Sequence, residues 1–184
     1  MSQSDDIENA VTAAEQAGHG LHPDPADPRL LRSALGQFAT GVTVITAREA
    51  DTGAPVGITV NSFASVSLDP ALVLWSAARS SMRHAHFSNA AAFAIHVLKA
   101  DQMAVAERFA RNGNGFDGLA YCLNGDGTPL LEGALARFEC VTEATHEGGD
   151  HTIIIGRVVR FQTAASGEPL VFAQGCYGSF AERG

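Results

Sequence analysis

The feature that most constrains the fold is a pair of strand-forming segments at 134–161, separated by a short glycine-rich turn. The first, ALARFECVTEATHE, alternates so that Phe138 and Cys140 fall on one face and Arg137 and Glu139 on the other. The second, TIIIGRVVRF, is a continuous apolar run of the kind expected for a strand covered on both sides. With EGGD between them, the two segments predict a long antiparallel hairpin.

Further short apolar or β-branched runs occur along the chain, and turn residues separate most of them. They predict strands at 42–46, 56–68, 71–76 and 93–98. A hairpin through the turn DTGAP joins the first two of these strands. Helices are predicted at 80–90, begun by Ser80 or Ser81, and at 101–111, begun by Asp101, and a Gly/Asn-rich loop is predicted at 112–130.

A helix is also predicted at the start of the main body of the chain. Asp27 is a suitable N-cap residue, and Pro28 follows at the first helical position. Leu31, Ala34, Leu35 and Phe38 then follow at helical spacing and form one apolar stripe, which Gly41 ends.

Six or seven strands joined mostly by short turns favour an antiparallel barrel with a few helical insertions. A doubly wound parallel sheet is disfavoured, because it needs helices that alternate with the strands.

Residues 1–28 contain a potential short helix followed by the Pro/Asp-rich linker LHPDPADP. We therefore expect an N-terminal arm at 1–28 and a single domain at 29–184.

Composition narrows the classes of function. The chain has 184 residues, 46% of them hydrophobic and 17% charged, which is typical of a globular protein. Its formal net charge of −8 argues against nucleic-acid binding. Three cysteines without a CxxC pair argue against a disulfide framework or a zinc cluster. With no predicted signal peptide or membrane span, we expect a cytoplasmic protein without membrane association.

Two sequence motifs resemble functional sites, but their context does not support that function. GNGFDG at 113–118 matches the dinucleotide-binding pattern, but a predicted helix precedes it and turn residues follow, so we interpret it as a loop. His84 and His86 point in different directions on a helix, and we assign no metal site to them. The chain also lacks a recognisable nucleophile elbow, which disfavours a hydrolase.

Three segments are candidates for binding, and each has a structural alternative. Small polar side chains in GITVNSFASVSL could hydrogen-bond to the edge of a flat ring, or they could form the solvent-exposed face of an ordinary amphipathic strand. SAARSSMRH at 76–84 could bind an anion at a helix N-terminus, or its serines could only cap that helix. Asp150 and His151 could contact a ligand from the glycine-flanked turn, or they could be ordinary turn residues.

Taken in order, these segments resemble the short-chain flavin reductases, the reductase components of two-component flavin-dependent monooxygenases. The resemblance runs from about Asp27 to Phe180 and combines T-x-N-S-F with G-D-H. The matching stretches are FATGVTVIT, PVGITVNSFASVSLDPALVLW, the Ser81 region, FAIHVL, GTPLLEGALARFECV, GGDHTIIIGRV and PLVFAQGCYGSF.

The resemblance implies an FMN-binding split barrel, mainly β, that forms a homodimer and passes reduced flavin to a partner monooxygenase. The cofactors implied are FMN or FAD together with NADH, with NADPH as the alternative nicotinamide. Implied flavin-binding residues are Thr43, Thr59, Val60, Asn61, Ser62, Ser76, Ala77, Ser81 and Phe87. Gly149, Asp150 and His151 correspond to the nicotinamide side, where His151 docks the ring and is the candidate proton donor.

One departure from the family pattern is visible, since many relatives have Asn where this chain has His96. This substitution affects either the surroundings of the cofactor or a contact between strands. Two other functions fit the same fold: a reductase of another acceptor, such as a corrinoid, and a flavin-binding module without turnover.

Overall fold

The computed structural model describes residues 7, 9, 11, 12 and 20–180. The helix predicted within residues 1–28 falls largely outside the described residues. The chain divides into two compact units, one of Met1–Ala39 with Ala173–Cys176 and one of Thr40–Phe172 with Tyr177–Gly184. Among the described residues, no helix is both long and apolar enough to cross a bilayer.

The first unit contains helix α2 (Arg29–Leu35), which is shorter than predicted. The Asp27 carboxylate accepts the Arg29 backbone N–H at 3.3 Å, and hydrogen bonds from Arg29 lower the pKa of Asp27 to about 2. Gly36 ends the helix, so the prediction that it runs to Gly41 is wrong. The predicted apolar stripe is not buried, because Leu35 is 65% exposed.

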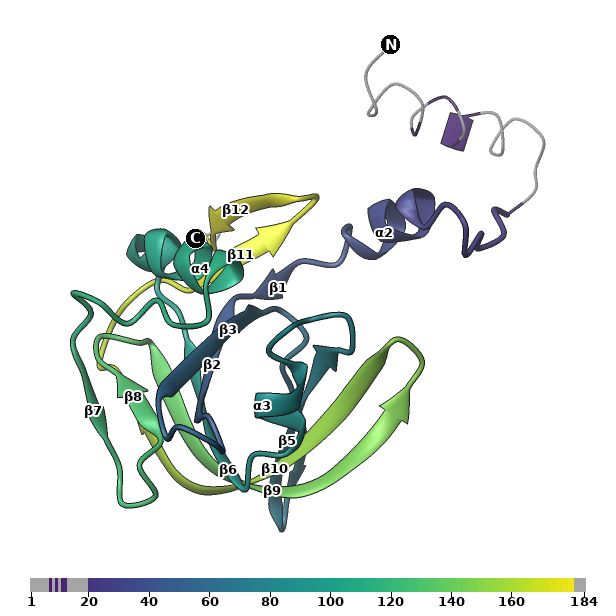
Figure 1. The fold of residues 1–184 in the computed structure, drawn as a ribbon. Coiled ribbons are helices and arrows are strands. Elements are labelled where there is room, and N and C mark those ends of the chain that lie inside the picture. The colour runs from purple at the N-terminus through teal and green to yellow at the C-terminus, as the bar shows by residue number, and fades with distance from the viewer. Residues whose placement is uncertain (1–6, 8, 10, 13–19, 181–184) are drawn as a thin grey trace. The chain divides into compact units, whose positions relative to one another are not determined.

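The second unit is built around a seven-stranded antiparallel sheet in the order β3-β2-β6-β9-β10-β5-β4. Its strands are β2 (Thr43–Arg48), β3 (Pro55–Val60), β4 (Ala64–Leu68), β5 (Ala71–Ala78), β6 (Ala92–Val97), β9 (Ala136–Gly148) and β10 (His151–Thr163). The edge strands β3 and β4 are joined by only three residues, 61–63, so the sheet must curl until its two edges meet. Figure 1 shows the strands curled around a common interior, with the β9–β10 hairpin extending beyond them.

The predicted antiparallel barrel is therefore confirmed, but the single strand predicted at 56–68 is wrong. Its alternation continues through 61–63, yet the chain bends there and passes from one edge of the sheet to the other. We call the junction between these edges, at residues 61–63, the seam of the barrel.

Smaller elements cover the barrel. A three-stranded sheet contains β1 (Thr40–Gly41), β11 (Leu170–Ala173) and β12 (Cys176–Ser179). Strands β7 (Tyr121–Leu123) and β8 (Pro129–Leu131) pair within the segment predicted as a loop at 112–130, whereas GNGFDG itself is a loop as predicted. The helical elements are α3 (His84–Ser88), η1 (Ala100–Gln102) and α4 (Met103–Arg111).

Three helix starts differ from the predictions. Helix α2 begins at Arg29, with Pro28 and not Asp27 at the N-cap position. Helix α3 begins at His84 and not at Ser80 or Ser81. Asp101 does not cap the other helix, because it lies inside η1, where the Gln102 side chain accepts the Lys99 backbone N–H at 3.0 Å.

The predicted β9–β10 hairpin is confirmed. Its register runs from Ala136 opposite Thr163 to Gly148 opposite His151, with Gly149 and Asp150 at the turn. Gly149 has a φ of +67°, a conformation that glycine adopts without steric cost. The prediction that the second strand is covered on both sides is wrong beyond residue 156, since Val159 is 55% and Phe161 70% exposed.

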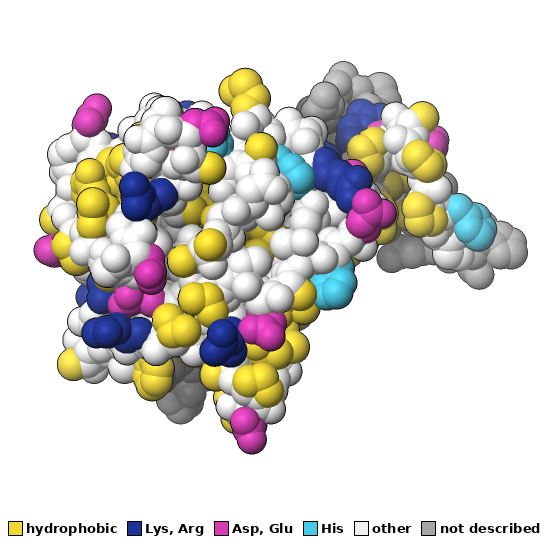
Figure 2. All heavy atoms as spheres, turned by 60° about the horizontal axis from the view of Figure 1, so that its bottom comes forward, with side chains coloured by type: hydrophobic (Ala, Val, Ile, Leu, Met, Phe, Trp, Pro, Cys, Tyr) yellow, Lys and Arg dark blue, Asp and Glu magenta, His cyan; other side chains and the backbone are white. Residues whose placement is uncertain are grey.

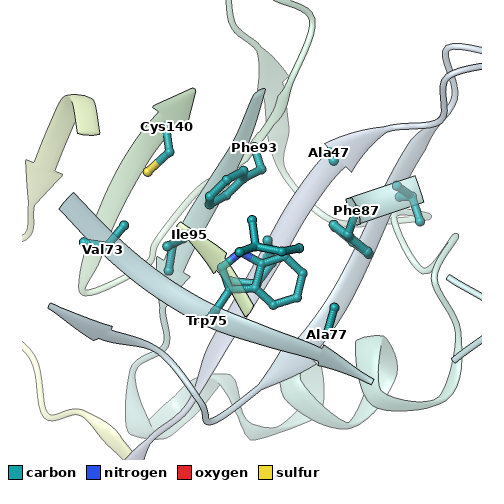
Figure 3. Close-up of a cluster of buried hydrophobic side chains, with 11 residues drawn as sticks. Ala47, Val73, Trp75, Ala77, Phe87, Phe93, Ile95 and Cys140 are labelled. Carbon is teal, nitrogen blue, oxygen red and sulfur yellow. The ribbon is translucent and has the colours of Figure 1, made fainter. Parts of the chain in front are cut away.

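The sheet separates two apolar clusters. Inside the barrel, Trp75 makes edge-on contacts with Phe87 and Phe93, at ring-centroid distances of 5.4 and 6.1 Å (Figure 3). The second cluster contains Val44 and Leu98 from the strand region and Phe109 from α4. Because side chains alternate along a strand, Val44 and Ile45 of β2 join different clusters.

Candidate functional site

The seam is held together by a serine. The Ser62 hydroxyl accepts the Ser76 backbone N–H at 3.0 Å and donates to the Ser76 carbonyl at 3.3 Å. This side chain therefore satisfies backbone groups of β5 that a paired strand would otherwise satisfy. As a result, two segments that the sequence singled out separately lie next to each other.

On the other side of the seam, β2 and β3 bring Thr43 opposite Val60. The buried Thr43 hydroxyl donates to the Val60 carbonyl at 3.0 Å, and the Thr59 hydroxyl donates to the Ala106 carbonyl of α4 at 2.7 Å. Each hydroxyl oxygen thus has its proton engaged by the backbone and keeps lone pairs for accepting hydrogen bonds.

Asn61 lies at the surface of the seam. Its side-chain nitrogen donates to the Thr40 hydroxyl at 3.2 Å, which fixes the amide plane. A pocket of about 170 Å³ opens here, lined by Val42, Thr59, Val60, Asn61, Ala110, Phe172 and Tyr177. Apolar walls with a few fixed polar groups are typical of sites for flat organic ligands.

The start of β10 lies along the end of β5. Thr152 pairs with Ala77 and His151 with Ala78, and the Arg79 backbone N–H donates to the Asp150 carbonyl at 2.9 Å. The structure therefore places the segment Ser76–Ala77 beside the segment Asp150–His151, although more than seventy residues separate them in sequence.

His151 is oriented by its neighbour. Its Nδ1 lies 2.7 Å from Asp150 Oδ1, and its side chain is 42% exposed. A carboxylate can only accept, so Nδ1 carries the proton in this contact. Nε2 is then the ring atom available to a ligand.

The arginines of SAARSSMRH are both held by the protein. Arg79 pairs with Glu147 at 3.0 Å. Arg83 donates to the carbonyls of Gly57, Phe109 and Ala110 at 3.0, 2.6 and 3.1 Å, and desolvation lowers its pKa. Arg83 therefore ties α3 to the end of α4, a role that no local pattern indicated.

Phe87 and Ser81 are two further residues that the family resemblance implies for flavin binding. Phe87 is 1% exposed and packs in the barrel interior, so its ring does not reach the surface. Ser81 is partly buried, and its hydroxyl accepts the Arg83 backbone N–H at 3.2 Å. This bond fixes the Ser81 side chain at the turn before α3.

His84, to which the sequence assigns no metal site, has a defined contact in the structure. Its Nε2 lies 2.9 Å from the Thr152 hydroxyl, next to His151. The contact joins α3 to the start of β10. Because 68 residues separate the two partners, no spacing in the sequence could have revealed it.

His96 makes a contact between strands. The Leu131 backbone N–H can only donate, so Nε2, 3.0 Å away, accepts; the Val44 carbonyl can only accept, so Nδ1, 3.1 Å away, donates. The side chain is completely buried, and this desolvation lowers its pKa to about 4. His96 is therefore neutral, and its two hydrogen bonds connect β6 to β2 and to β8.

The cysteines and other potential metal ligands are dispersed. Cys122 and Cys176 are exposed, whereas burial raises the pKa of the Cys140 thiol to about 12. Within the described ranges, His, Cys, Asp and Glu side chains do not form a group of three or more that could hold a metal ion.

Comparison with known proteins identifies relatives of the chain. Residues 35–181 match the flavin reductase like domain. The chain is 53% identical over 165 residues to FMN reductase (NADH) SmoA of Agrobacterium fabrum, covering 90% of this chain and 93% of the relative. It is 38% identical to HsaB of Rhodococcus jostii, the reductase subunit of a flavin-dependent monooxygenase, covering 89% and 84%.

A solved structure is similar over most of both chains. NADH:FAD oxidoreductase SgcE6 of Streptomyces globisporus, in complex with NAD and FAD fragments, superposes with a TM-score of 0.80. The two are 38% identical, and the match covers 88% of this chain and 98% of the other.

Proposed function

Because the chain belongs to the flavin reductase family, we propose that it oxidises NADH, reduces FMN or FAD, and supplies the reduced flavin to a flavin-dependent monooxygenase. The observation that carries this proposal is the seam, where the Ser62–Ser76 bonds bring the polar end of β3 to the end of β5, which pairs with the start of β10 and His151. Hydride transfer from nicotinamide to flavin is chemistry that the cofactors supply when bound.

The residues at the seam fit a flavin. In our assignment, Thr59, Val60, Asn61 and Ser62 lie along the edge of the ring system, with Thr43 behind them. The amide oxygen of Asn61 accepts no hydrogen bond within the described part of the chain, so it is available to a ring N–H. Ser76, Ala77 and Ser81 hold the ribityl-phosphate end, and Phe87 supports it by packing in the same cluster as Ala77.

The turn at Gly149–Asp150 forms the nicotinamide side. Asp150 orients His151, whose Nε2 is free to accept from the nicotinamide amide group. The protein's task is then to hold two flat rings in contact and exclude water, which is worth several orders of magnitude in rate. In this assignment His151 docks the nicotinamide and is not an obligatory acid or base.

The active form in this proposal is a homodimer. Large apolar side chains are exposed on β4 and on the far half of β10, where a soluble surface is usually polar. They are Val66 at 47%, Leu68 at 94%, Val159 at 55% and Phe161 at 70% exposure. Figure 2 shows apolar side chains exposed between charged ones on one face. A mass near twice 19.2 kDa by light scattering would support the dimer, and a monomer would refute it.

The proposal is tested by steady-state oxidation of NADH and NADPH, each with FMN and with FAD. We expect consumption that depends on added flavin and is faster with NADH. Tight retention of flavin without NADH oxidation would instead indicate a flavin-binding module. Oxidation that proceeds only with a different acceptor, such as a corrinoid, would overturn the assignment of flavin as the product.

A further inference from the structure

Another pocket, of about 420 Å³ and with a polar lining, lies near the open end of the β9–β10 hairpin, whereas His151 lies at its turn. The residues that matter here are Lys99, Leu131, Gly133, Ala134, Arg137 and Gln162. Gln162 lies eleven residues along β10 from His151, which is roughly 36 Å at 3.3 Å per residue. The pocket is therefore separate from the proposed nicotinamide side of the active site.

Lys99 is the only lysine of the chain, and it is partly buried at this pocket. Its ammonium group makes no ion pair within the described ranges. The side chain runs close beneath the Gly167 turn, where a Cβ would come within 3.1 Å of Lys99 Cε. A cation that lines a pocket and has no carboxylate partner in the described part of the chain can donate hydrogen bonds to an anion there.

Arg137 faces the same pocket and is also incompletely satisfied. Its Nη2 donates to Gln162 Oε1 at 2.9 Å and lies 3.9 Å from Glu139, but its Nε is buried with no hydrogen-bond partner. Glu139 is itself shared, since Arg160 lies 3.9 Å away and Asn124 donates to it at 3.0 Å. One Nη atom of the guanidinium group is therefore bonded to Gln162, whereas its Nε–H has no acceptor.

The backbone adds donors of the same kind. Gly133 has a φ of +77°, and neither its N–H nor that of Ala134 donates to an acceptor in the described part of the chain. Consecutive free N–H groups at a positive-φ residue form a concavity that favours anions. Glu132 also lines the pocket, and this residue is exposed to solvent. Leu131 and small side chains supply apolar wall.

We propose that this pocket binds a small organic anion, a carboxylate or a phosphate carried on a compact apolar body. Lys99 and Arg137 hold the anionic oxygens, the amides of Gly133 and Ala134 donate to them, and Leu131 packs against the body. The inference does not depend on the function proposed for the seam.

The single lysine allows a direct test on the intact protein. In protein labelled with [ε-¹³C]lysine, Lys99 gives the only lysine resonance, which can be followed while benzoate or inorganic phosphate is added at constant ionic strength. We expect a saturable shift with benzoate or phosphate in the millimolar range and none with neutral benzamide. Saturation by phosphate alone would assign a phosphate ligand, and by benzoate alone a carboxylate. No saturable shift with either anion would overturn the proposal.

A variant separates binding from a general salt effect. Arg137→Met keeps the length of the side chain and should weaken the anion about tenfold, the cost of losing one charge-assisted hydrogen bond. Arg157→Met is the matched control, because Arg157 lies on the neighbouring strand β10, where it pairs with Glu143 at 3.0 Å. If both variants bound the anion equally weakly, or if neither bound it more weakly than the unmodified protein, the proposed site would be contradicted. The lysine resonance in each variant before addition verifies that the protein is folded.

Discussion

His96 and His151 are the same residue in opposite surroundings. His96 is completely buried in β6, with both ring nitrogens bonded to backbone groups of neighbouring strands. His151 begins β10, is 42% exposed, and has one ring nitrogen bonded to the adjacent Asp150. One imidazole has no unused hydrogen-bonding capacity, and the other keeps one nitrogen for a ligand.

This difference distinguishes a polar side chain that stabilises the barrel from one that is available to a ligand. His96 can be protonated only by breaking its acceptor bond from Leu131, so its neutral form is part of the folded structure. His151 can change partners without disturbing a strand, because within the described ranges its side chain hydrogen-bonds only to Asp150 in the same turn. The comparison predicts that changes at His96 affect folding and changes at His151 affect catalysis.

The largest effect is expected from His96→Ala. It removes a buried ring and leaves the Leu131 N–H and the Val44 carbonyl without partners, which should lower the free energy of unfolding by about 4 kcal/mol. Urea denaturation measures this change. His151→Ala is the matched control and should cost less than about 1 kcal/mol, because the side chain is partly exposed. Similar losses in both variants would contradict the comparison.

Stability should also depend on pH through His96. The unfolded chain binds a proton as the pH falls below about 6.5, whereas burial keeps the folded side chain neutral down to about 4. Stability is therefore lost as the pH falls from 6.5 towards 4, by about 3 kcal/mol over this window. Denaturation at several pH values measures the slope. His96→Asn should flatten it, and an unchanged slope in that variant would assign the loss to other groups.

At His151 the expected effect is kinetic. His151→Ala removes the nicotinamide contact in our assignment, so the KM for NADH should rise about tenfold, while the KM for flavin changes little. Steady-state kinetics with each substrate varied in turn measure both constants. His151→Gln, which keeps an acceptor in the turn, should recover part of the loss. An unchanged dependence on NADH would remove His151 from the site.

The sequence predicts the hairpin well because its pattern is local: two alternating or apolar segments and a glycine turn are enough. It does not predict the seam, since alternation continues through 61–63 and the bend depends on the bonds of Ser62 to Ser76. The same holds for His96, whose partner Leu131 is 35 residues away, and for Arg83, which binds carbonyls of another helix. Family resemblance could point to Asp150 and His151, but not to the contacts that position them.

The smallest effect is expected at Asp150, which orients His151 without contacting the nicotinamide in our assignment. Asp150 is 91% exposed, and an exposed pair of this kind contributes at most about 1 kcal/mol. Asp150→Asn should therefore raise the KM for NADH only about two- to fivefold, because the amide oxygen can still accept from Nδ1. In the double variant with His151→Ala the effect should vanish, since the carboxylate then has no ring to orient. A full additional loss in the double variant would mean that Asp150 contacts the nicotinamide itself.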